Sequence, residues 1–521
     1  MSPHNPSRLL AGATLLALVL SFAAPFPALA ASSGPVAEPP PTETPTDDAP
    51  PTGDAPIEAA AGDAVGTPAP EAETPTAVEP IDAQAAPAAP EPEAAPAALL
   101  ELAPEGTTVA IVDAQGELLP LASDQAAEIA VKGDPVWCPA SLAAPTPGLN
   151  GCTTSYTSFA SLIAALPSLP VPGDGVIWIE DAYDSSVNDP GVPEFALLGG
   201  STHSALAPFT LTLRGGWDGL SGSKLVTGTS ELNGRLLISG WQNDISLSDL
   251  LITGTIGGSG SNAVNISTTG AINLTRIESR NNQGSGARLN NSGGTGPVTI
   301  SSSQFSNNAG SGGGLIVASA GAITLANITA GSNTAGYGID LDNTSSPSNA
   351  GVSLTGLSTF KSNYYSGAYI ASWGLIAAND LDASSNGTSG SGGGAYLLNN
   401  GSPIAAGIRL TGTNVFNAND DLGLYISSLG PVALNSIIAN GNDDGSGVEI
   451  YSSAAAAAQP VTLTGISQLK YNGGHGLYVS TNGAISINSL SASGNSITGA
   501  QLANNSFGFV SPVTFTGTSA F

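Results

Sequence analysis

The stretch GLYVSTNGAISINSLSASGN, residues 476–495, contains three short segments in which apolar residues alternate with polar or small ones. The first segment follows a glycine, the second also opens with glycine, and the third ends in asparagine. Alternation with period two is typical of a strand that buries one face. The stretch therefore predicts three short strands, with Gly and Asn at corners where the backbone must turn left-handed.

The same pattern occurs eleven times along the chain, counting this stretch. Its first segments begin 23 to 29 residues apart, at Gly234, Asn262, Gly286, Gly314, Gly338, Gly367, Gly394, Gly423, Gly447, Gly476 and Gly499. One such unit cannot bury its apolar face alone, whereas stacked units share a core and complete one another's backbone hydrogen bonds. Each repeat therefore predicts one coil of a parallel β-helix, about 4.8 Å thick.

The corner asparagines give a second expectation. An Asn that recurs at one corner can hydrogen-bond to its copy in the next coil. The third segments supply such residues at Asn307, Asn333, Asn363, Asn386 and Asn495.

With these repeats, and with Leu213–Trp217 (LRGGW) before them, the chain resembles the right-handed parallel β-helix proteins of the pectin lyase-like superfamily. It closely resembles large bacterial surface proteins in which a Gly-Gly-Trp strand precedes the coils. This resemblance covers residues 173–521, about two thirds of the chain. The resemblance implies an all-β, right-handed parallel β-helix, and it is specific for fold but weak for function.

The region before the coils divides into two segments. Residues 1–30 have a basic start, an apolar run and an Ala-Leu-Ala site, which predicts a secretory signal peptide; an uncleaved membrane anchor is the alternative. Residues 31–105 form a Pro/Ala/Glu-rich linker with fifteen acidic residues and no basic ones, which predicts a disordered, extended spacer. The linker holds about half of the net charge of −29. This acidity argues against nucleic acid as a partner.

Residues 106–172 should form a small region that leads into the coils. Val109–Val112 and Leu118–Leu121 predict a hairpin, and Thr157–Leu166 predicts an amphipathic helix. Because a solenoid must cover the exposed end of its core, we expect this helix to be an amino-terminal cap. At the other end the sequence stops at Phe521 inside a coil. We expect either a longer protein or a partner on that coil, including a second copy of the chain.

Cys138 and Cys152 are the only two cysteines. In an exported chain they predict a disulfide, and closing so short a loop contributes on the order of 3 kcal/mol. A metal site would need more ligands than these two, and no metal or cofactor is expected.

The proposed register turns one column of side chains outward from the first segments. That column is Arg288, Ile316, Asp340, Tyr369, Tyr396, Tyr425, Glu449, Tyr478 and Gln501. Tyr369, Tyr396, Tyr425 and Tyr478 are therefore the candidate ligand-binding residues. One interpretation is stacking that only stabilises the sheet. The other is a platform for sugar rings, because tyrosine has a flat apolar face and a polar tip.

Asp340 and Asp342 are the candidate catalytic pair under an alternative, enzymatic reading. They project outward two residues apart on one strand, roughly 6.5–7 Å, near the lower limit for an inverting glycosidase pair. Gly474-His475-Gly476, one coil after Asp443-Asp444, resembles part of the polygalacturonase site, but the Asn-Thr-Asp and Arg-Ile-Lys motifs of those enzymes are missing. We expect His475 to be a turn residue.

These observations favour an exported, secreted or cell-surface β-helix protein without enzymatic activity. Its expected role is adhesion or surface architecture, with carbohydrate binding along the outer face of one sheet. The alternative is a polysaccharide lyase or glycoside hydrolase of the pectin lyase-like fold. A polysaccharide or cell-surface glycan is the expected partner in either case.

Overall fold

The computed structural model describes residues 110–112, 118–120, 135–139, 146–149, 152–169, 173–256, 261–455, 457–504 and 511–521. All of them belong to one compact unit, residues 92–521. The predicted signal peptide and acidic linker lie outside the described residues.

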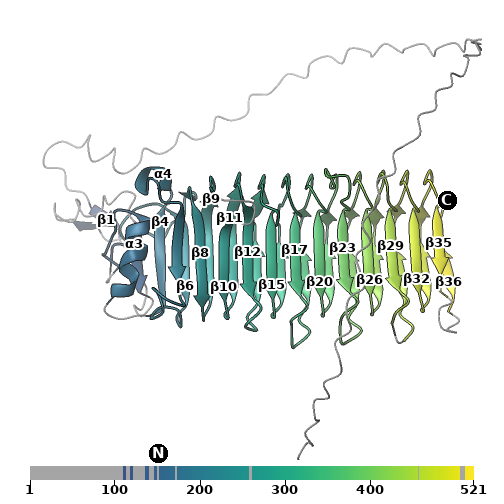
Figure 1. Cartoon of the computed structure of the whole chain (residues 1–521), viewed down its shortest axis with the longest axis horizontal. Coiled ribbons are helices and arrows are strands. Elements are labelled where there is room, and N and C mark those ends of the chain that lie inside the picture. The colour runs from purple at the N-terminus through teal and green to yellow at the C-terminus, as the bar shows by residue number, and fades with distance from the viewer. Residues whose placement is uncertain are drawn as a thin grey trace, which may run out of the picture. The chain divides into compact units, whose positions relative to one another are not determined.

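The chain forms a parallel β-solenoid of about ten turns, as the repeats predict (Figure 1). Strands from successive coils stack into three sheets. The first sheet consists, in stacking order, of β5 (Glu194–Leu198), β8 (Arg235–Trp241), β10 (Asn262–Thr268), β12 (Ser285–Asn291), β15 (Leu315–Ser319), β17 (Ile339–Asn343), β20 (Ala368–Ser372), β23 (Ala395–Asn399), β26 (Leu424–Ser428), β29 (Val448–Ser452), β32 (Leu477–Thr481) and β35 (Ala500–Ala503).

In each coil, the strand that follows the first turn belongs to the second sheet. Its strands are β3 (Val136–Pro139), β4 (Gly175–Glu180), β6 (Leu211–Trp217), β7 (Ser230–Leu232), β9 (Ile245–Ile252), β11 (Ile272–Arg280), β13 (Val298–Ser301), β14 (Gln304–Ser306), β16 (Ile323–Ala326), β18 (Val352–Thr355), β21 (Ile376–Asn379), β24 (Ile408–Thr411), β27 (Val432–Asn435), β30 (Val461–Thr464), β33 (Ile485–Asn488) and β36 (Val513–Thr516). Among the strands that the structure describes in this sheet, only β3 pairs antiparallel, with β4.

The third sheet contains the shortest strands, which correspond to the third predicted segments. They are β19 (Ser358–Thr359), β22 (Leu381–Asp382), β25 (Asn414–Val415), β28 (Ile437–Ile438), β31 (Ser467–Gln468) and β34 (Leu490–Ser491). The inward residues of all three sheets form one continuous apolar core.

Several short elements precede the coils. β1 (Ala110–Val112) and β2 (Leu118–Pro120) form the predicted antiparallel hairpin. The helix α3 (Phe159–Ala165) buries Phe159, Leu162 and Ile163, and it is followed by the 3₁₀-helix η1 (Leu166–Ser168). A one-turn helix, α4 (Ser185–Asn188), follows β4. None of the helices in the described part of the chain is long and apolar enough to span a membrane.

The predicted disulfide between Cys138 and Cys152 is present. Both cysteines are fully buried, in a small cluster with Val136, Trp178 and Trp217. The bond therefore ties β3 to the loop that follows it.

A ladder of buried asparagines runs along the corner after the third strands. Its members are Asn282, Asn308, Asn333, Asn363, Asn386, Asn419, Asn442, Asn472 and Asn495. Each Nδ2 donates to the Oδ1 of the next member over 2.8–3.3 Å. The predicted corner hydrogen bond is thus confirmed. The prediction was wrong by one residue in one coil, because Asn308 joins the ladder while Asn307 takes the left-handed turn conformation.

The asparagine ladder also explains the recurrent glycine that opens each first strand. A Cβ atom added to Gly394 would lie 2.4 Å from the carbonyl oxygen of Gly423 and 2.8 Å from Nδ2 of Asn419. Glycine is required here by the close approach of the next coil. The glycine therefore leaves the space that the asparagine side chain and the backbone of the next coil occupy.

The first two predicted repeat starts are one residue too early. Val264 pairs with Ala287, and Leu236 pairs with Val264, so the inward positions of β8 and β10 follow Arg235 and Ala263 rather than Gly234 and Asn262. From Gly286 onward the predicted register holds.

The structural repeat is two coils, not one. The turn between the first and second strands is three residues long in one coil, as at 320–322, and six to eight in the next, as at 292–297 and 344–351. Figure 1 shows the longer turns projecting along one edge in alternate coils. The double repeat is visible in the starts at Gly286, Gly338, Gly394, Gly447 and Gly499, which are 52, 56, 53 and 52 residues apart.

In most coils the last residue of the first strand closes the turn that follows it. Before short turns it is a serine or a threonine, such as Ser319, whose hydroxyl bonds both N–H and C=O of Gly321. Before the long turns after β12, β17 and β23 it is an asparagine, such as Asn343, whose Nδ2 donates to the carbonyl of Ala350 at the far end of the turn. The long turn after β29 is the exception, because this strand ends in Ser452. One side chain thus closes each type of turn.

The core alternates with the same two-coil period. A buried position at or just after the third strand holds a large residue in long-turn coils (Phe305, Phe360, Phe416 and Leu469) and alanine in short-turn coils (Ala330, Ala383, Ala439 and Ala492). Two residues earlier in each coil the order is reversed. Long-turn coils have a small polar residue there, Ser358 or Asn414, and short-turn coils have a large apolar one, Leu381 or Ile437. The small polar residue accepts a hydrogen bond from the preceding coil, as Asn414 Oδ1 does from Leu381 N–H over 3.2 Å.

Candidate functional site

The predicted outward column lies on the first sheet in the predicted register. Direct pairing joins Arg288 to Ile316, Ile316 to Asp340 and Asp340 to Tyr369. The column continues through Tyr396, Tyr425, Glu449, Tyr478 and Gln501. The four predicted tyrosines are half-buried on this face.

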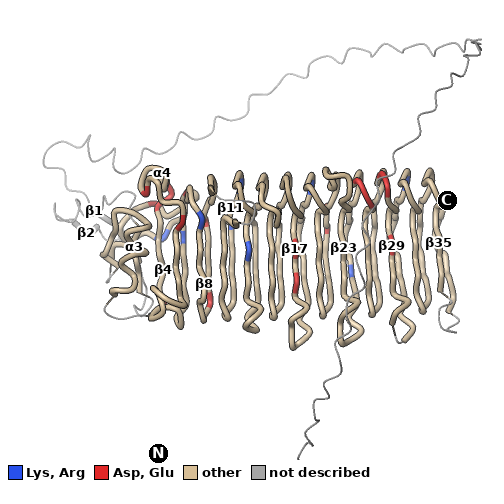
Figure 2. The backbone as a smooth tube through the Cα atoms, in the orientation of Figure 1, with Lys and Arg blue, Asp and Glu red and all other residues tan. Residues whose placement is uncertain are grey.

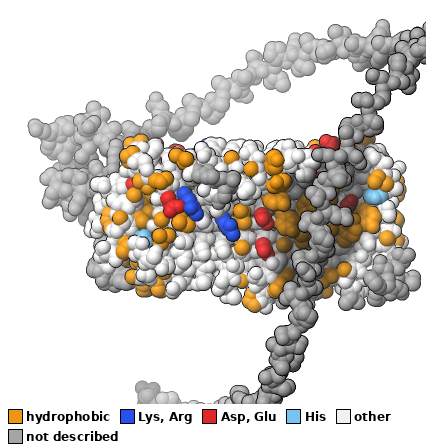
Figure 3. All heavy atoms as spheres, in the orientation of Figure 1, with side chains coloured by type: hydrophobic (Ala, Val, Ile, Leu, Met, Phe, Trp, Pro, Cys, Tyr) orange, Lys and Arg blue, Asp and Glu red, His pale blue; other side chains and the backbone are white. Residues whose placement is uncertain are grey.

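The tyrosines form a longer stack than the column alone provides. In order, the stacked rings are Tyr364, Tyr365, Tyr337, Tyr369, Tyr396, Tyr425, Tyr451, Tyr478 and His475, with neighbouring centroids 4.9–6.3 Å apart. We call this set the aromatic ladder. It includes eight of the eleven tyrosines of the chain, and Figure 3 shows apolar side chains gathered on this face.

Five ladder members were missed by the sequence reasoning. Where the column holds a carboxylate, a tyrosine from a neighbouring position takes the place in the stack: Tyr337 beside Asp340, and Tyr451 beside Glu449. Tyr451 could have been found, because it is the next outward residue of β29. Tyr337, Tyr364, Tyr365 and His475 lie on the turns before the first strands, whose course the alternation of strand residues does not specify.

Each inner ring of the ladder has an aromatic neighbour on both sides. Between Tyr337 and Tyr478 the rings are inclined to one another by 32–43°. Such tilted pairs contribute about 0.5–1.5 kcal/mol each beyond their buried area. Because neighbours occupy part of every face, the ladder offers a continuous strip of ring edges, partial faces and hydroxyls rather than separate flat platforms.

Carboxylates flank the ladder and hold its hydroxyls. Tyr396 donates to Asp421 Oδ2 over 2.9 Å, and Tyr451 donates to Glu449 Oε2 over 3.1 Å. Burial, and then the nearby negative charge, raise the pKa of Tyr396 and of Tyr451 well above the usual tyrosine range. These phenols stay protonated at neutral pH, so the strip is apolar with an acidic border.

His475 does more than turn the chain. Its ring lies 5.6 Å from that of Tyr478, and Nδ1 lies 2.8 Å from the hydroxyl oxygen of Thr498. The histidine therefore extends the ladder by one ring.

Charged side chains are sparse on the coils, as Figure 2 shows. Asp420, Asp421, Asp443 and Asp444 gather at one corner, where burial and the other three carboxylates raise the pKa of Asp420. Within the described ranges, no group of three or more His, Cys, Asp or Glu side chains is arranged to hold a metal ion.

Asp340 and Asp342 differ in environment although they lie on one strand. Asp342 is exposed and accepts hydrogen bonds from the backbone N–H and hydroxyl of Thr344. Asp340 lies between Ile316 and Tyr369 on the sheet. Burial first, and the charge of Asp342 second, raise the pKa of Asp340.

The raised pKa of Asp340 predicts that this residue lowers the stability of the fold at neutral pH but not at acidic pH. Folded Asp340 holds its proton more tightly than the unfolded chain, so its contribution to stability is full below about pH 4 and is lost as the pH rises through the raised pKa. We expect Asp340→Asn to raise the melting temperature at pH 7 and to leave it nearly unchanged at pH 3, measured by calorimetry. An effect of equal size at both pH values would contradict the assignment.

Comparison of the chain with protein-family models, with curated proteins and with solved structures finds no match.

Proposed function

We propose that the chain is an exported, non-enzymatic β-helix surface protein that binds a neutral glycan along the aromatic ladder. The single observation that carries the proposal is the uninterrupted run of nine aromatic rings on one outer face. An extended polysaccharide fits such a strip, because its sugar rings present apolar C–H faces and its hydroxyls can bond the phenols and carboxylates. Adhesion or surface architecture is the role that follows.

The charges around the ladder favour a neutral ligand. Asp340, Asp342, Asp421 and Glu449 lie along it, and the only basic member of the outward column is Arg288, two coils from Asp340. A polyanion such as a pectin would meet like charges, which cost free energy.

The finer features of the fold belong to the same proposal. A right-handed winding is favoured because a crossover between parallel strands in one sheet is almost always right-handed. Together with the repeats, this supports a pectin lyase-like β-helix. The buried residues of α3 join the core of the coils, which supports its role as the amino-terminal cap.

The proposal is tested by retention of the chain on insoluble neutral polysaccharides. Replacing Tyr369, Tyr396 and Tyr425 together by alanine should weaken binding at least about tenfold, since each aromatic contact contributes roughly 0.5–1.5 kcal/mol. Tyr471→Ala is the matched control, because Tyr471 is 70% exposed and has no ring partner among the described residues. Circular dichroism checks that the triple variant folds. Equal retention of the triple variant and the wild type would contradict the proposal.

A polysaccharide lyase or glycoside hydrolase is the second candidate function. It is favoured by one observation: the carboxyls of Asp340 and Asp342 lie side by side on β17 with different environments, and the pKa of Asp340 is raised. A carboxyl whose pKa is raised by burial is suited to the role of a general acid. Release of new reducing ends from a polysaccharide, abolished by Asp340→Asn, would replace the binding proposal with this one.

A further inference from the structure

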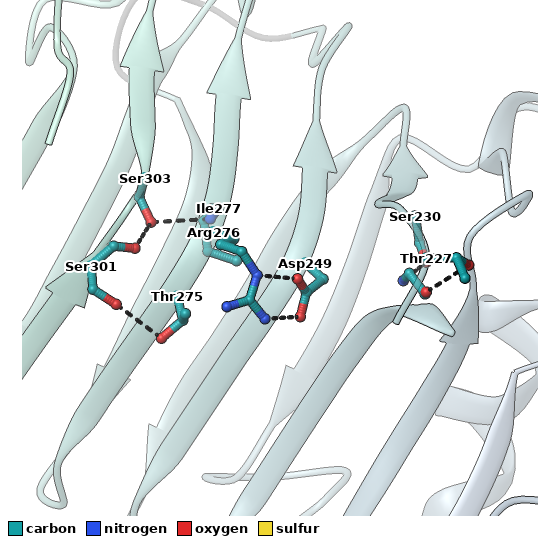
Figure 4. A network of polar contacts seen from close by, with 9 residues as sticks. Thr227, Ser230, Asp249, Thr275, Arg276, Ile277, Ser301 and Ser303 are labelled. Atoms are coloured by element: carbon teal, nitrogen blue, oxygen red, sulfur yellow. Dashed lines mark hydrogen bonds and ion pairs between the residues drawn. The ribbon is translucent and has the colours of Figure 1, made fainter. Parts of the chain in front are cut away.

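A polar cleft of about 650 Å³ lies near the amino-terminal end of the coils, away from the aromatic ladder. One wall is the segment 226–229, which precedes β7. The other wall is built from the left-handed corner positions of four consecutive coils, Asp249, Arg276, Ser302 and Asn327. Figure 4 shows this corner and the polar contacts around it.

The centre of the cleft is a fixed ion pair. The side chain of Asp249 is only 2% exposed, and it accepts two hydrogen bonds from Arg276, from Nε at 2.5 Å and from Nη2 at 2.8 Å. The side chain of Arg276 is 55% exposed. Asp249 thus uses two of the five guanidinium N–H donors, and within the described chain the other three have no partner.

The pair of Asp249 and Arg276 is unusual when the left-handed corner positions of all the coils are compared. In later coils the same left-handed position holds residues suited to a turn: Gly356, Asp380, Gly412, Ser436, Gly465 and Ser489. A long side chain such as Arg276, with φ of 53°, is uncommon in this conformation. Backbone conformations that a residue disfavours persist where the site has a use for the side chain. The turn alone would be better served by glycine or serine.

The rest of the cleft offers uncharged hydrogen-bonding groups. Gln304, Asn327 and Thr329 line it, and within the described residues their side chains make no hydrogen bond. Amides and hydroxyls both donate and accept. Together with Arg276 they form a surface that can bond groups of mixed donor and acceptor character.

The charges of the cleft restrict the ligand. Asp249 is paired with Arg276 and Glu278 with Arg280, so the charges balance and the cleft has no surplus positive charge to attract an anion. An apolar molecule would cover these exposed donors and acceptors without bonding them, which is costly. A sugar fits both conditions because its hydroxyls donate and accept without carrying charge, and the volume lies within the 300–1,000 Å³ typical of small-molecule sites.

We propose that this cleft binds a neutral saccharide of one or two residues, held by Arg276, Gln304 and Asn327. The site is separate from the aromatic ladder, and the inference does not rest on the ladder binding anything.

Saturation-transfer NMR of the full chain tests this site. Cellobiose, lactose and N,N′-diacetylchitobiose are the neutral probes, and digalacturonate is the acidic one. We expect transfer to at least one neutral probe. Asn327→Gly should raise its Kd roughly fivefold or more by removing the amide hydrogen bonds. The fold should tolerate the change because Asn327 has a φ of 56°, which glycine adopts freely.

Asn349→Gly is the matched control, since Asn349 has a φ of 52° and lies in the turn before β18, outside the cleft. Arg276→Lys is a second variant: it keeps a charge beside Asp249 but loses the forked donors, and it should also weaken binding. Equal losses in Asn327→Gly and Asn349→Gly, transfer to digalacturonate alone, or no transfer to any neutral probe would overturn the proposal.

The two sugar sites are distinguished by one further variant. Tyr425→Ala should leave disaccharide binding in the cleft unchanged. If Tyr425→Ala abolishes the signal while Asn327→Gly does not, the saccharide lies on the ladder; the cleft proposal then fails and the proposed function stands.

Discussion

Asn386→Ala is expected to lower the free energy of unfolding by about 3–5 kcal/mol. The Asn386 side chain accepts from the backbone N–H and from Nδ2 of Asn363, and it donates to Phe360 C=O and Asn419 Oδ1 over 2.9–3.1 Å. Alanine removes all four hydrogen bonds. Their partners remain buried, where no water can replace the lost contact, and each unpaired group costs about 1–3 kcal/mol.

Urea denaturation followed by circular dichroism measures this loss. Coils contact only their neighbours, so hydrogen exchange should also show the damage concentrated in the coils next to Asn386. Asn488→Ala is the control, because Asn488 is exposed on the second sheet and should cost less than about 0.5 kcal/mol. Equal urea midpoints for the two variants would show that the asparagine ladder does not carry the stability assigned to it.

Phe416→Ala should be comparably destabilising, by about 3–5 kcal/mol. Phe416 is fully buried, and the stack places Ala383 and Ala439 in the coils on either side of it. Alanine at this position would make three small residues in succession, and the cavity could not be filled by either neighbour. The cost is the lost burial of the ring plus the cavity that remains.

Phe416→Leu is the natural control for this cavity. Leu469 occupies the equivalent position two coils further on, so the site accommodates leucine in a coil of the same type. We expect a cost below about 1.5 kcal/mol for leucine, measured by the same urea titration. If both substitutions cost the same, the alternation of large and small residues is not what fills the core.

Period-two alternation was sufficient to predict the strands and most of their register. Alternating residues such as Ile485 and Ile487 specify which face is buried, and a slip of one residue would expose them. This is why the outward column from Arg288 to Gln501 could be written down in advance. The register failed only at Gly234 and Asn262, where a glycine or asparagine stands one residue before the true start.

The aromatic ladder was partly predictable from the sequence, whereas the cleft was not predicted. Tyr369 and its column follow from strand register, whereas Tyr337 and Tyr365 come from turns whose path depends on packing between coils. The pairing of Asp249 with Arg276 joins corners of two coils 27 residues apart. Local alternation contains no signal for such contacts, so neither residue was among the predicted site residues.

The two-coil repeat limits how such a rod can change in length. Removing one coil, residues 394–422, would bring Ala383 next to Ala439 and Leu381 next to Ile437, so that one layer is empty and the other overfilled. Removing two coils, residues 394–446, would place Ala383 next to Leu469 and keep the layers complementary. Insertions and deletions should therefore be tolerated in even numbers of coils, in steps of about 9.6 Å. The solenoid should therefore gain or lose two coils more readily than one.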